Sequence, residues 1–187
     1  MQYNLLNYGN TTSYCSTTIN NIDDKNGYLK DIIGYLKPDI FAVEEIHGTN
    51  SVVDNLLNNA LNQDGRTYYQ RASITNYSGS DICNMLYFDA RKFTLYSQYA
   101  ISTSLRDINL YTLYYNSPDV ANNNDTAFMT FILLHLKAGS YSSDAQTRAD
   151  MTAALMNYLD VENATGNNLA MGDFNVYSSS EEAFQNL

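Results

Sequence analysis

Hydrophobic residues along this chain follow two periods, and each period predicts a different kind of element. Alternating or continuous apolar runs, which are typical of strands, cover residues 1–6, 39–43, 67–72, 82–88, 93–101, 108–115, 127–135 and 169–173. Apolar residues spaced three and four apart, which are typical of amphipathic helices, cover residues 26–36, 51–61 and 144–159. Residues 89–92 are expected to form a hairpin loop between the strands on either side.

The order of these elements predicts an α/β fold of the α+β kind. The chain opens β-α-β-α, continues with a run of strands and then returns to a helix and a strand, which indicates two mixed β-sheets flanked by helices. With 187 residues and only two prolines to mark a linker, residues 1–187 are expected to form a single domain. No apolar run approaches the ~20 residues that span a bilayer, so no membrane span is expected.

The net charge of −10 limits the partners that this chain can attract. It argues against broad, charge-driven adhesion to nucleic acid. It does not exclude a phosphodiester substrate, because a site that binds cations supplies its own positive charge and needs carboxylates to do so. Acidity that serves only solubility is the alternative interpretation.

The remaining composition bears on the compartment. The chain has 17 Tyr, no Trp and many Asn residues, a pattern frequent in secreted proteins, and we expect an extracellular or periplasmic location. Its two cysteines, Cys15 and Cys83, are either a single disulfide or two unrelated thiols, and their spacing is not that of a metal site.

The segment Leu169-Ala170-Met171-Gly172-Asp173-Phe174-Asn175 carries the clearest chemical signal. Residues 169–171 are expected to form a short buried strand, and the glycine lets the backbone leave it tightly. Asp173 and Asn175 then lie at the end of a strand, where open α/β sheets place their sites. Asp173 can bind a divalent cation or hold a nucleophilic water, and Asn175 can donate to a phosphate oxygen. The alternative is an ordinary turn.

Other strand ends also present polar groups. Residues 39–43 are expected to form an apolar strand that ends in Glu44 and Glu45. Only one of the two should face a given site, because neighbouring strand residues point to opposite faces. Such a carboxylate suits Mg²⁺, although a solvated strand end is the alternative.

His135 ends the apolar run 131–134 and is either a proton-transfer group or a satisfied structural residue. Asn4 interrupts the first strand and must be paired or functional, whereas the role of His47 is less clear.

Taken together, these strand ends resemble the endonuclease/exonuclease/phosphatase superfamily. The matching motifs are Tyr-Asn-Leu-Leu-Asn (residues 3–7), Pro-Asp-Ile-x-Ala-x-x-Glu (38–45), His-Leu-Lys-Ala (135–138) and Gly-Asp-Phe-Asn (172–175), in that order. The resemblance covers essentially the whole chain. It implies the deoxyribonuclease-I-like fold, a four-layer sandwich of two mixed β-sheets flanked by helices. Arg148 also lies where many members carry an arginine.

The resemblance implies a role for each polar strand end. Asn4 lies beside the metal and the phosphate, and Glu45 is the ligand of Mg²⁺ or Mn²⁺, with Ca²⁺ as a further candidate. His135 contacts the scissile phosphate. Asp173 positions or activates the attacking water, and Asn175 binds the phosphate and orients Asp173.

The chain departs from the family pattern at two places. Many members have Gln before the metal-binding glutamate, where this chain has Glu44. The family also closes with a late strand that bears Asp and with a Ser-Asp-His-type motif, and nothing after Asn175 matches either. We therefore expect residues 1–187 to be the larger N-terminal part of the domain, truncated before its final strands. A longer parent chain or a partner protein would supply the rest, and this segment alone should be inactive.

The function predicted from the sequence is a divalent-metal-dependent phosphodiester hydrolase, a secreted endonuclease that acts on nucleic acid by in-line attack of water on phosphorus. Two alternatives remain open. One is a sphingomyelinase-type or phosphatase-type member of the same superfamily, and the other is a non-catalytic binding module or fragment on this fold.

Overall fold

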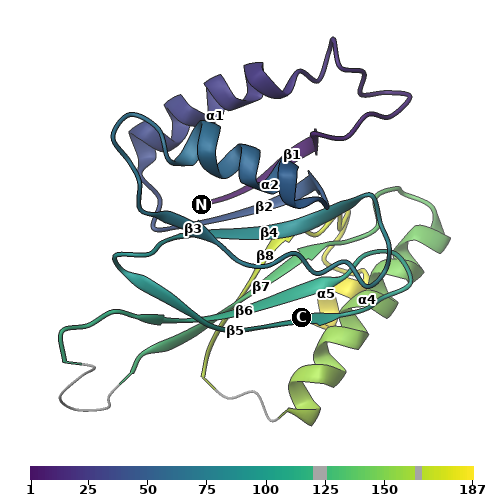
Figure 1. Ribbon diagram of the computed structural model, residues 1–187. Helices are drawn as coiled ribbons and strands as arrows, with labels where there is room; N and C mark the ends of the chain where they lie inside the picture. Colours follow the sequence, from purple (N-terminus) through teal and green to yellow (C-terminus); the bar gives the residue numbers. More distant parts are fainter. Residues whose placement is uncertain (120–125, 163–165) are drawn as a thin grey trace.

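Two four-stranded β-sheets lie face to face between layers of helices in the computed structural model, which describes residues 1–119, 126–162 and 166–187 (Figure 1). The first sheet has the order β1-β2-β4-β3 and is built from Gln2–Tyr8, Ile40–His47, Ile82–Asp89 and Tyr69–Arg71. The second sheet has the order β5-β6-β7-β8 and is built from Phe93–Ile101, Ile108–Tyr115, Phe128–His135 and Asn167–Asp173.

Helices cover the outer faces of both sheets. On the first sheet lie α1 (Ile22–Leu36) and α2 (Asn50–Leu56), which continues as the π-helical turn η1 (Leu57–Leu61). On the second sheet lie α4 (Ser142–Val161) and the short α5 (Glu182–Gln185). Among the helices of the described residues, none combines the length and the apolar character that crossing a membrane requires.

The two central strands of the second sheet, β6 and β7, are buried on both faces over most of their length, which explains their nearly continuous apolar sequences. In β6, Tyr111 and Leu113 pack between the two sheets, whereas Ile108 and Leu110 pack beneath α4. Strand β7 follows the same alternation. The two sheets and the two helical layers therefore form the four-layer sandwich that the sequence predicts.

Two β-α-β units bring the polar strand ends together. Strands β1 and β2 are parallel and connected through α1, and strands β7 and β8 are parallel and connected through α4. Parallel strands end at the same edge of a sheet. Asn4 is accordingly the register partner of Glu44, and His135 is the register partner of Asp173.

The hairpin predicted at residues 89–92 is wrong in its topology. The segment does form a tight turn, in which Lys92 N donates to Asp89 O at 3.0 Å. However, β4 and β5 belong to different sheets, so this turn carries the chain from one sheet to the other. Hydrophobic period identifies strands but does not assign each strand to a sheet.

The burial predicted for residues 169–171 is also wrong, although the strand itself exists. Leu169 is 45% exposed, because β8 is the edge strand of its sheet and pairs only with β7. Of the two interpretations of the cysteines, the structure agrees with separate thiols, because Cys15 and Cys83 are both free and buried.

Gly172 allows β8 to approach β7 closely just before the candidate site. Its φ angle is +143°, and a Cβ atom at this position would overlap the carbonyl oxygen of Leu134 on β7. Gly166 provides a contrast, because its φ angle is +121° but a Cβ atom there would meet no atom within 4 Å.

We therefore expect Gly172→Ala to lower the free energy of unfolding by on the order of 3 kcal/mol, because it combines backbone strain with a clash against backbone. Gly166→Ala carries only the backbone strain and should cost about 1 kcal/mol. Urea unfolding followed by far-UV circular dichroism measures both. Equal losses in the two variants would contradict the close approach of β8 to β7.

Candidate active site

The side chain of Asn4 connects the two sheets at their polar ends. Its Nδ2 donates to Glu45 Oε1 from β2 and to Asp173 Oδ2 from β8, both at 3.0 Å. Its Oδ1 accepts from Leu6 N at 2.9 Å, which fixes the orientation of the amide. The two carboxylates, which are 128 positions apart in the chain, are therefore held by one nitrogen atom.

Glu45 reaches this position through a distortion of β2. Its φ angle is +58°, and the pairing of β2 with β4 shifts register between Val43 and Ile46, so the strand has a β-bulge here. Glu45 Oε2 accepts from Asn7 N at 3.1 Å and from Asn7 Nδ2 at 3.3 Å. Sequence reasoning missed Asn7 as a site residue, although it ends the motif at residues 3–7.

The bulge also changes the position of Glu44. Gln2 and Asn4 are two residues apart on β1, so their side chains lie on the same face. Gln2 Nε2 donates to Glu44 Oε2 at 2.5 Å, and Asn4 Nδ2 donates to Glu45 Oε1. Both glutamates thus lie on one side, and the prediction that only one faces the site is wrong. Burial, together with the charges of Asp173 and Glu45, raises the pKa of Glu44 to about 7, while the hydrogen bond from Gln2 opposes the shift.

His135 is buried at the same point, with its side chain only 3% exposed. Its Nε2 lies 3.5 Å from Glu45 Oε1. Burial lowers the pKa of His135 to about 4, and the nearby charge of Arg106 lowers it too, whereas the charges of Glu45 and Asp173 oppose the shift. At neutral pH His135 is therefore an uncharged imidazole, which can donate one hydrogen bond and accept another.

Asp173 and Asn175 form a compact turn at the end of β8. Asn175 N donates to Asp173 Oδ1 at 3.2 Å, and Asn175 Nδ2 donates to Leu136 O at 3.1 Å. The φ angle of Asn175 is +50°, a left-handed conformation that Asn tolerates better than most residues. The turn proposed as the alternative interpretation is therefore present, and it is the same turn that orients Asp173.

Arg106 is a second residue that sequence reasoning missed. It lies in the loop between β5 and β6, and its Nη1 donates to His135 O and Leu136 O, both at 3.3 Å. Burial lowers the pKa of Arg106, and the charges of Glu45 and Asp173 counteract this effect, so the guanidinium lies within electrostatic reach of both carboxylates. A single arginine in a polar loop leaves no periodic signal in the sequence.

Two other residues singled out in the sequence lie outside the cluster. Arg148 is 1% exposed and has a structural role: it donates to Glu181 Oε2 on one side and to Lys137 O and Gly139 O on the other. It therefore ties the loop after β7 to the segment after β8. His47 ends β2 opposite Ile82, and in the described part of the chain it makes none of the contacts that link the cluster.

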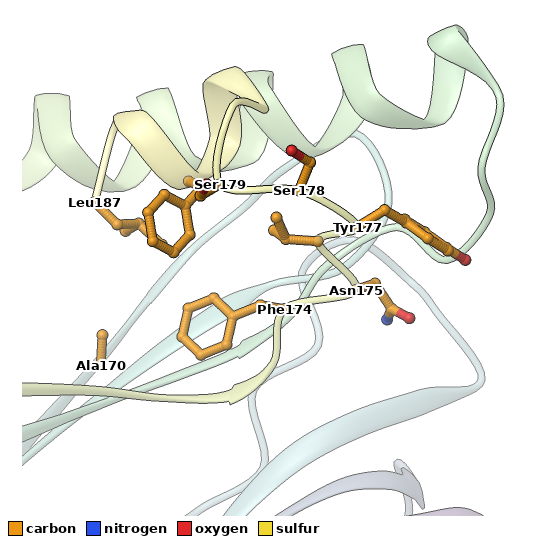
Figure 2. Close-up of a pocket in the computed structure, with 9 residues that line it drawn as sticks. Ala170, Phe174, Asn175, Tyr177, Ser178, Ser179 and Leu187 are labelled. Atoms are coloured by element: carbon orange, nitrogen blue, oxygen red, sulfur yellow. The ribbon is translucent and has the colours of Figure 1, made fainter.

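An apolar cavity of about 650 Å³ lies beside the cluster, between β8 and α5. Its wall includes Phe174, Val176 and Phe184, together with the hydroxyl groups of Ser178 and Ser179. Figure 2 shows the Phe174 ring pointing into this cavity and the Asn175 carboxamide pointing away from that ring. The turn after β8 thus separates the polar cluster from the apolar cavity.

The donor set fits a hard divalent cation. Among the described residues, no group of three or more His, Cys, Asp and Glu side chains encloses a metal by itself. Mg²⁺ does not need one, because it typically takes one or two carboxylates and keeps its waters. Glu45 and Asp173 supply two carboxylates, and the buried Glu44 Oε1 has no hydrogen-bond partner among the described residues. An added positive charge would compensate all three acidic groups.

The two shifted groups make opposite contributions to stability. The folded-state pKa of His135 is about 4, below its ordinary 6.5, so the unfolded chain binds more protons between these pH values and this contribution to stability grows as pH rises. The folded-state pKa of Glu44 is about 7, above its ordinary 4.5, so the folded chain binds more protons and this contribution shrinks as pH rises.

We therefore expect Glu44→Gln to become more stable relative to the wild type as pH rises from 4.5 to 6.5, and His135→Gln to become less stable relative to the wild type. Each difference should change by on the order of 2 kcal/mol across this window. Urea unfolding with EDTA present, followed by far-UV circular dichroism, measures both. Differences that change in the same direction would contradict the assignment.

Comparisons with known proteins agree with this geometry. The model of the Endonuclease/Exonuclease/phosphatase family matches residues 1–186. An endonuclease/exonuclease/phosphatase family protein from Bacteroides thetaiotaomicron has a TM-score of 0.68 at 13% identity, covering 99% of this chain and 65% of its own. A mannosyl-6-phosphatase from the same organism has a TM-score of 0.67 at 12% identity, with coverage of 99% and 67%. TDP2 from D. rerio, complexed with single-stranded DNA product, has a TM-score of 0.55 at 12% identity, with coverage of 95% and 60%.

This chain thus spans about two thirds of the length of these solved structures. A comparison with curated protein sequences gave no significant match. The structural likeness shows the deoxyribonuclease-I-like fold, and the family model covers nearly every residue. The chain belongs to the Endonuclease/Exonuclease/phosphatase family.

Proposed function

We propose that this chain carries the active site of a divalent-metal-dependent phosphodiester hydrolase in which water attacks phosphorus in line. The observation that carries the proposal is the amide of Asn4, which holds Glu45 and Asp173 side by side next to the uncharged His135. Membership of a family that contains phosphoesterases supports it.

Each residue has a distinct task in this proposal. Glu45, with Asp173 beside it, binds Mg²⁺ or Mn²⁺, and Ca²⁺ is a further candidate; the bound ion supplies positive charge against the phosphoryl oxygens. His135 donates its N–H to a phosphoryl oxygen in the transition state. Asp173 orients the attacking water and accepts its proton. Asn175 keeps Asp173 in place through its backbone N–H.

Nucleic acid is the substrate class we propose. TDP2, one of the similar structures, holds single-stranded DNA product, which shows that this fold accommodates a polynucleotide. The net charge of −10 makes wide electrostatic contact with DNA unfavourable, so recognition would be confined to the site, where Arg106 adds local positive charge.

Endonucleolytic cleavage and an extracellular or periplasmic location are part of the same proposal, and the polar, tyrosine-rich composition supports the location.

Phosphomonoester hydrolysis is the second candidate, because a mannosyl-6-phosphatase is among the similar structures. The two functions differ in the substrate that is cleaved and not in the residues that would bind the ion. Comparing the rates at which the protein hydrolyses a phosphodiester and a phosphomonoester of the same chromophore therefore distinguishes the two functions.

The first test concerns the cation. Glu45→Gln should weaken Mn²⁺ binding by at least about tenfold, because it removes the charged ligand while keeping the size of the side chain. Titration followed by the electron paramagnetic resonance signal of free Mn²⁺ measures the Kd. Glu182→Gln, which removes an exposed carboxylate from α5, is the matched control and should bind as the wild type does. Equal affinity in Glu45→Gln and the wild type would overturn the proposed metal site.

The second test concerns catalysis. Asp173→Asn should lower the turnover of bis(4-nitrophenyl) phosphate by about 10²- to 10⁴-fold without changing the circular dichroism spectrum, because the nearly isosteric amide cannot accept the proton. Turnover is measured on the protein as purified from its source, with Mg²⁺ or Mn²⁺ and again with EDTA, which should abolish it. Hydrolysis of 4-nitrophenyl phosphate in preference to the diester would favour the phosphatase candidate. Unchanged turnover in Asp173→Asn would remove Asp173 from the mechanism.

A further inference from the structure

Strand β1 leaves its extended path just before the site. Its pairing with β2 shifts register between Asn4 and Tyr8, and the residues in between include Leu6 with φ +50° and Asn7 with φ +55°. A left-handed conformation costs roughly 1–2 kcal/mol at a residue with a side chain, and here two such residues are consecutive. Contacts from elsewhere in the fold must hold this segment in place.

The distorted segment has a clear consequence for Glu45. In the left-handed conformation, Asn7 directs both its backbone N and its side-chain Nδ2 at Glu45 Oε2, at 3.1 and 3.3 Å. This leaves Glu45 Oε1 facing Asn4 and His135. The rotamer of the candidate metal ligand therefore depends on the conformation of Asn7.

Lys25 provides the main contact that holds the segment. Its Nζ donates to Leu5 O at 2.6 Å and to Leu6 O at 2.8 Å. Asn20 Nδ2 completes the set by donating to Asn7 O at 2.8 Å. Three successive carbonyl groups of the distorted segment thus accept hydrogen bonds from side chains that lie outside β1.

The position of Lys25 is itself fixed at the start of α1. Asn21 caps this helix and accepts from the backbone N of Asp23 and Asp24 at 2.8 and 3.1 Å. The neighbouring residue Asn26 is anchored to the end of β1, because Tyr8 Oη donates to its Oδ1 at 2.5 Å. The start of α1, and with it the backbone of Lys25, is therefore tied to the end of β1.

We propose that Lys25 is a positioning residue of the metal site: by binding the carbonyl groups of Leu5 and Leu6 it sets the backbone so that Asn7 holds Glu45 for the cation. The inference rests on the proposed function for the identity of the ligand site. Burial lowers the pKa of Lys25, while the charge of Glu45 acts in the opposite direction, so the ammonium group and the Glu45 carboxylate affect each other.

A purely structural role, in which Lys25 only ties α1 to β1, makes a different prediction. It would lower the free energy of unfolding but would leave the ligand geometry unchanged in the folded protein. Two measurements on folded protein separate these roles: the Mn²⁺ Kd, and the amide ¹H chemical shift of Asn7, which reports its hydrogen bond to the Glu45 carboxylate without any metal.

The variants are Lys25→Met, which keeps the apolar stem, and Lys25→Arg, which keeps the charge and the donors. Lys30→Met is the matched control, because Lys30 is the other lysine of α1 and does not bind the distorted segment. We expect Lys25→Met to weaken Mn²⁺ binding 10- to 100-fold and to move the Asn7 amide resonance upfield. Lys25→Arg should recover most of the affinity, and Lys30→Met should behave as the wild type does.

Several results would decide the matter. Wild-type Mn²⁺ affinity and an unmoved Asn7 resonance in Lys25→Met would overturn the positioning role. If Lys25→Met does not fold, Lys25→Gln takes its place; because it retains one donor pair, the loss of affinity and the upfield shift should go in the same direction but be smaller. The double variant with Asn7→Gly adds a cycle: if Lys25 acts through Asn7, the losses of affinity should be less than additive. With Lys25 intact, unchanged Mn²⁺ binding in Glu45→Gln would refute the proposed function, while the Asn7 resonance would still test the role of Lys25.

Discussion

The arrangement of this site depends on one carboxamide group that binds two carboxylates. Glu45 and Asp173 come from different sheets, and like charges brought together in a half-buried place repel each other. Asn4 Nδ2 donates one hydrogen to each of them at 3.0 Å, which makes their proximity favourable without adding a net charge. A lysine at this position would also neutralise the carboxylates, but it would occupy them with a permanent cation. An amide leaves the negative charge of both carboxylates available to a metal ion. A lysine at position 4 would make Glu45 and Asp173 part of a salt bridge, whereas asparagine leaves them able to bind a cation.

The protonation of the surrounding groups is consistent with cation binding. Burial keeps His135 uncharged, so the imidazole does not compete as a cation for the Glu45 carboxylate. Arg106 lies within electrostatic reach of both carboxylates, but its Nη1 donates to the backbone carbonyl groups of His135 and Leu136. Its positive charge is therefore close to the site while its donors are engaged elsewhere. The shifted pKa of Glu44 follows from the same crowding of acidic groups, because part of the shift comes from Asp173 and Glu45. A cation binds more readily when the nearby histidine is neutral, and burial in this fold keeps His135 in that state at neutral pH.

The sequence was most informative where structure depends on local pattern. Periodicity predicted the strands and the long helices, because the spacing of apolar residues depends on which faces of an element are buried. The order of the elements then predicted the two-sheet sandwich. The five residues named for the site lie together as expected.

The predictions that were wrong concern features that depend on pairing between distant segments. The exposure of Leu169 follows from the edge position of β8. The shared face of Glu44 and Glu45 follows from a bulge in β2, the strand that pairs with β1 on one side and β4 on the other. Arg106 was missed because a loop residue carries no period, and only the folded chain brings it near the carboxylates.

Backbone strain is concentrated at the site and in the segment that supports it, and contacts within the fold hold it there. In the described part of the chain six residues other than glycine have positive φ angles, and four of them, Leu6, Asn7, Glu45 and Asn175, belong to the site or to the segment that supports it. Such conformations cost of order 1–3 kcal/mol each and persist only where surrounding contacts over-determine them. Those contacts come from the chain itself: Lys25 and Asn20 hold the carbonyl groups of β1, and the Asp173 side chain holds the Asn175 backbone. A cation that enters such a site meets ligands already in position and has little ordering entropy to offset, which is the advantage of preorganisation.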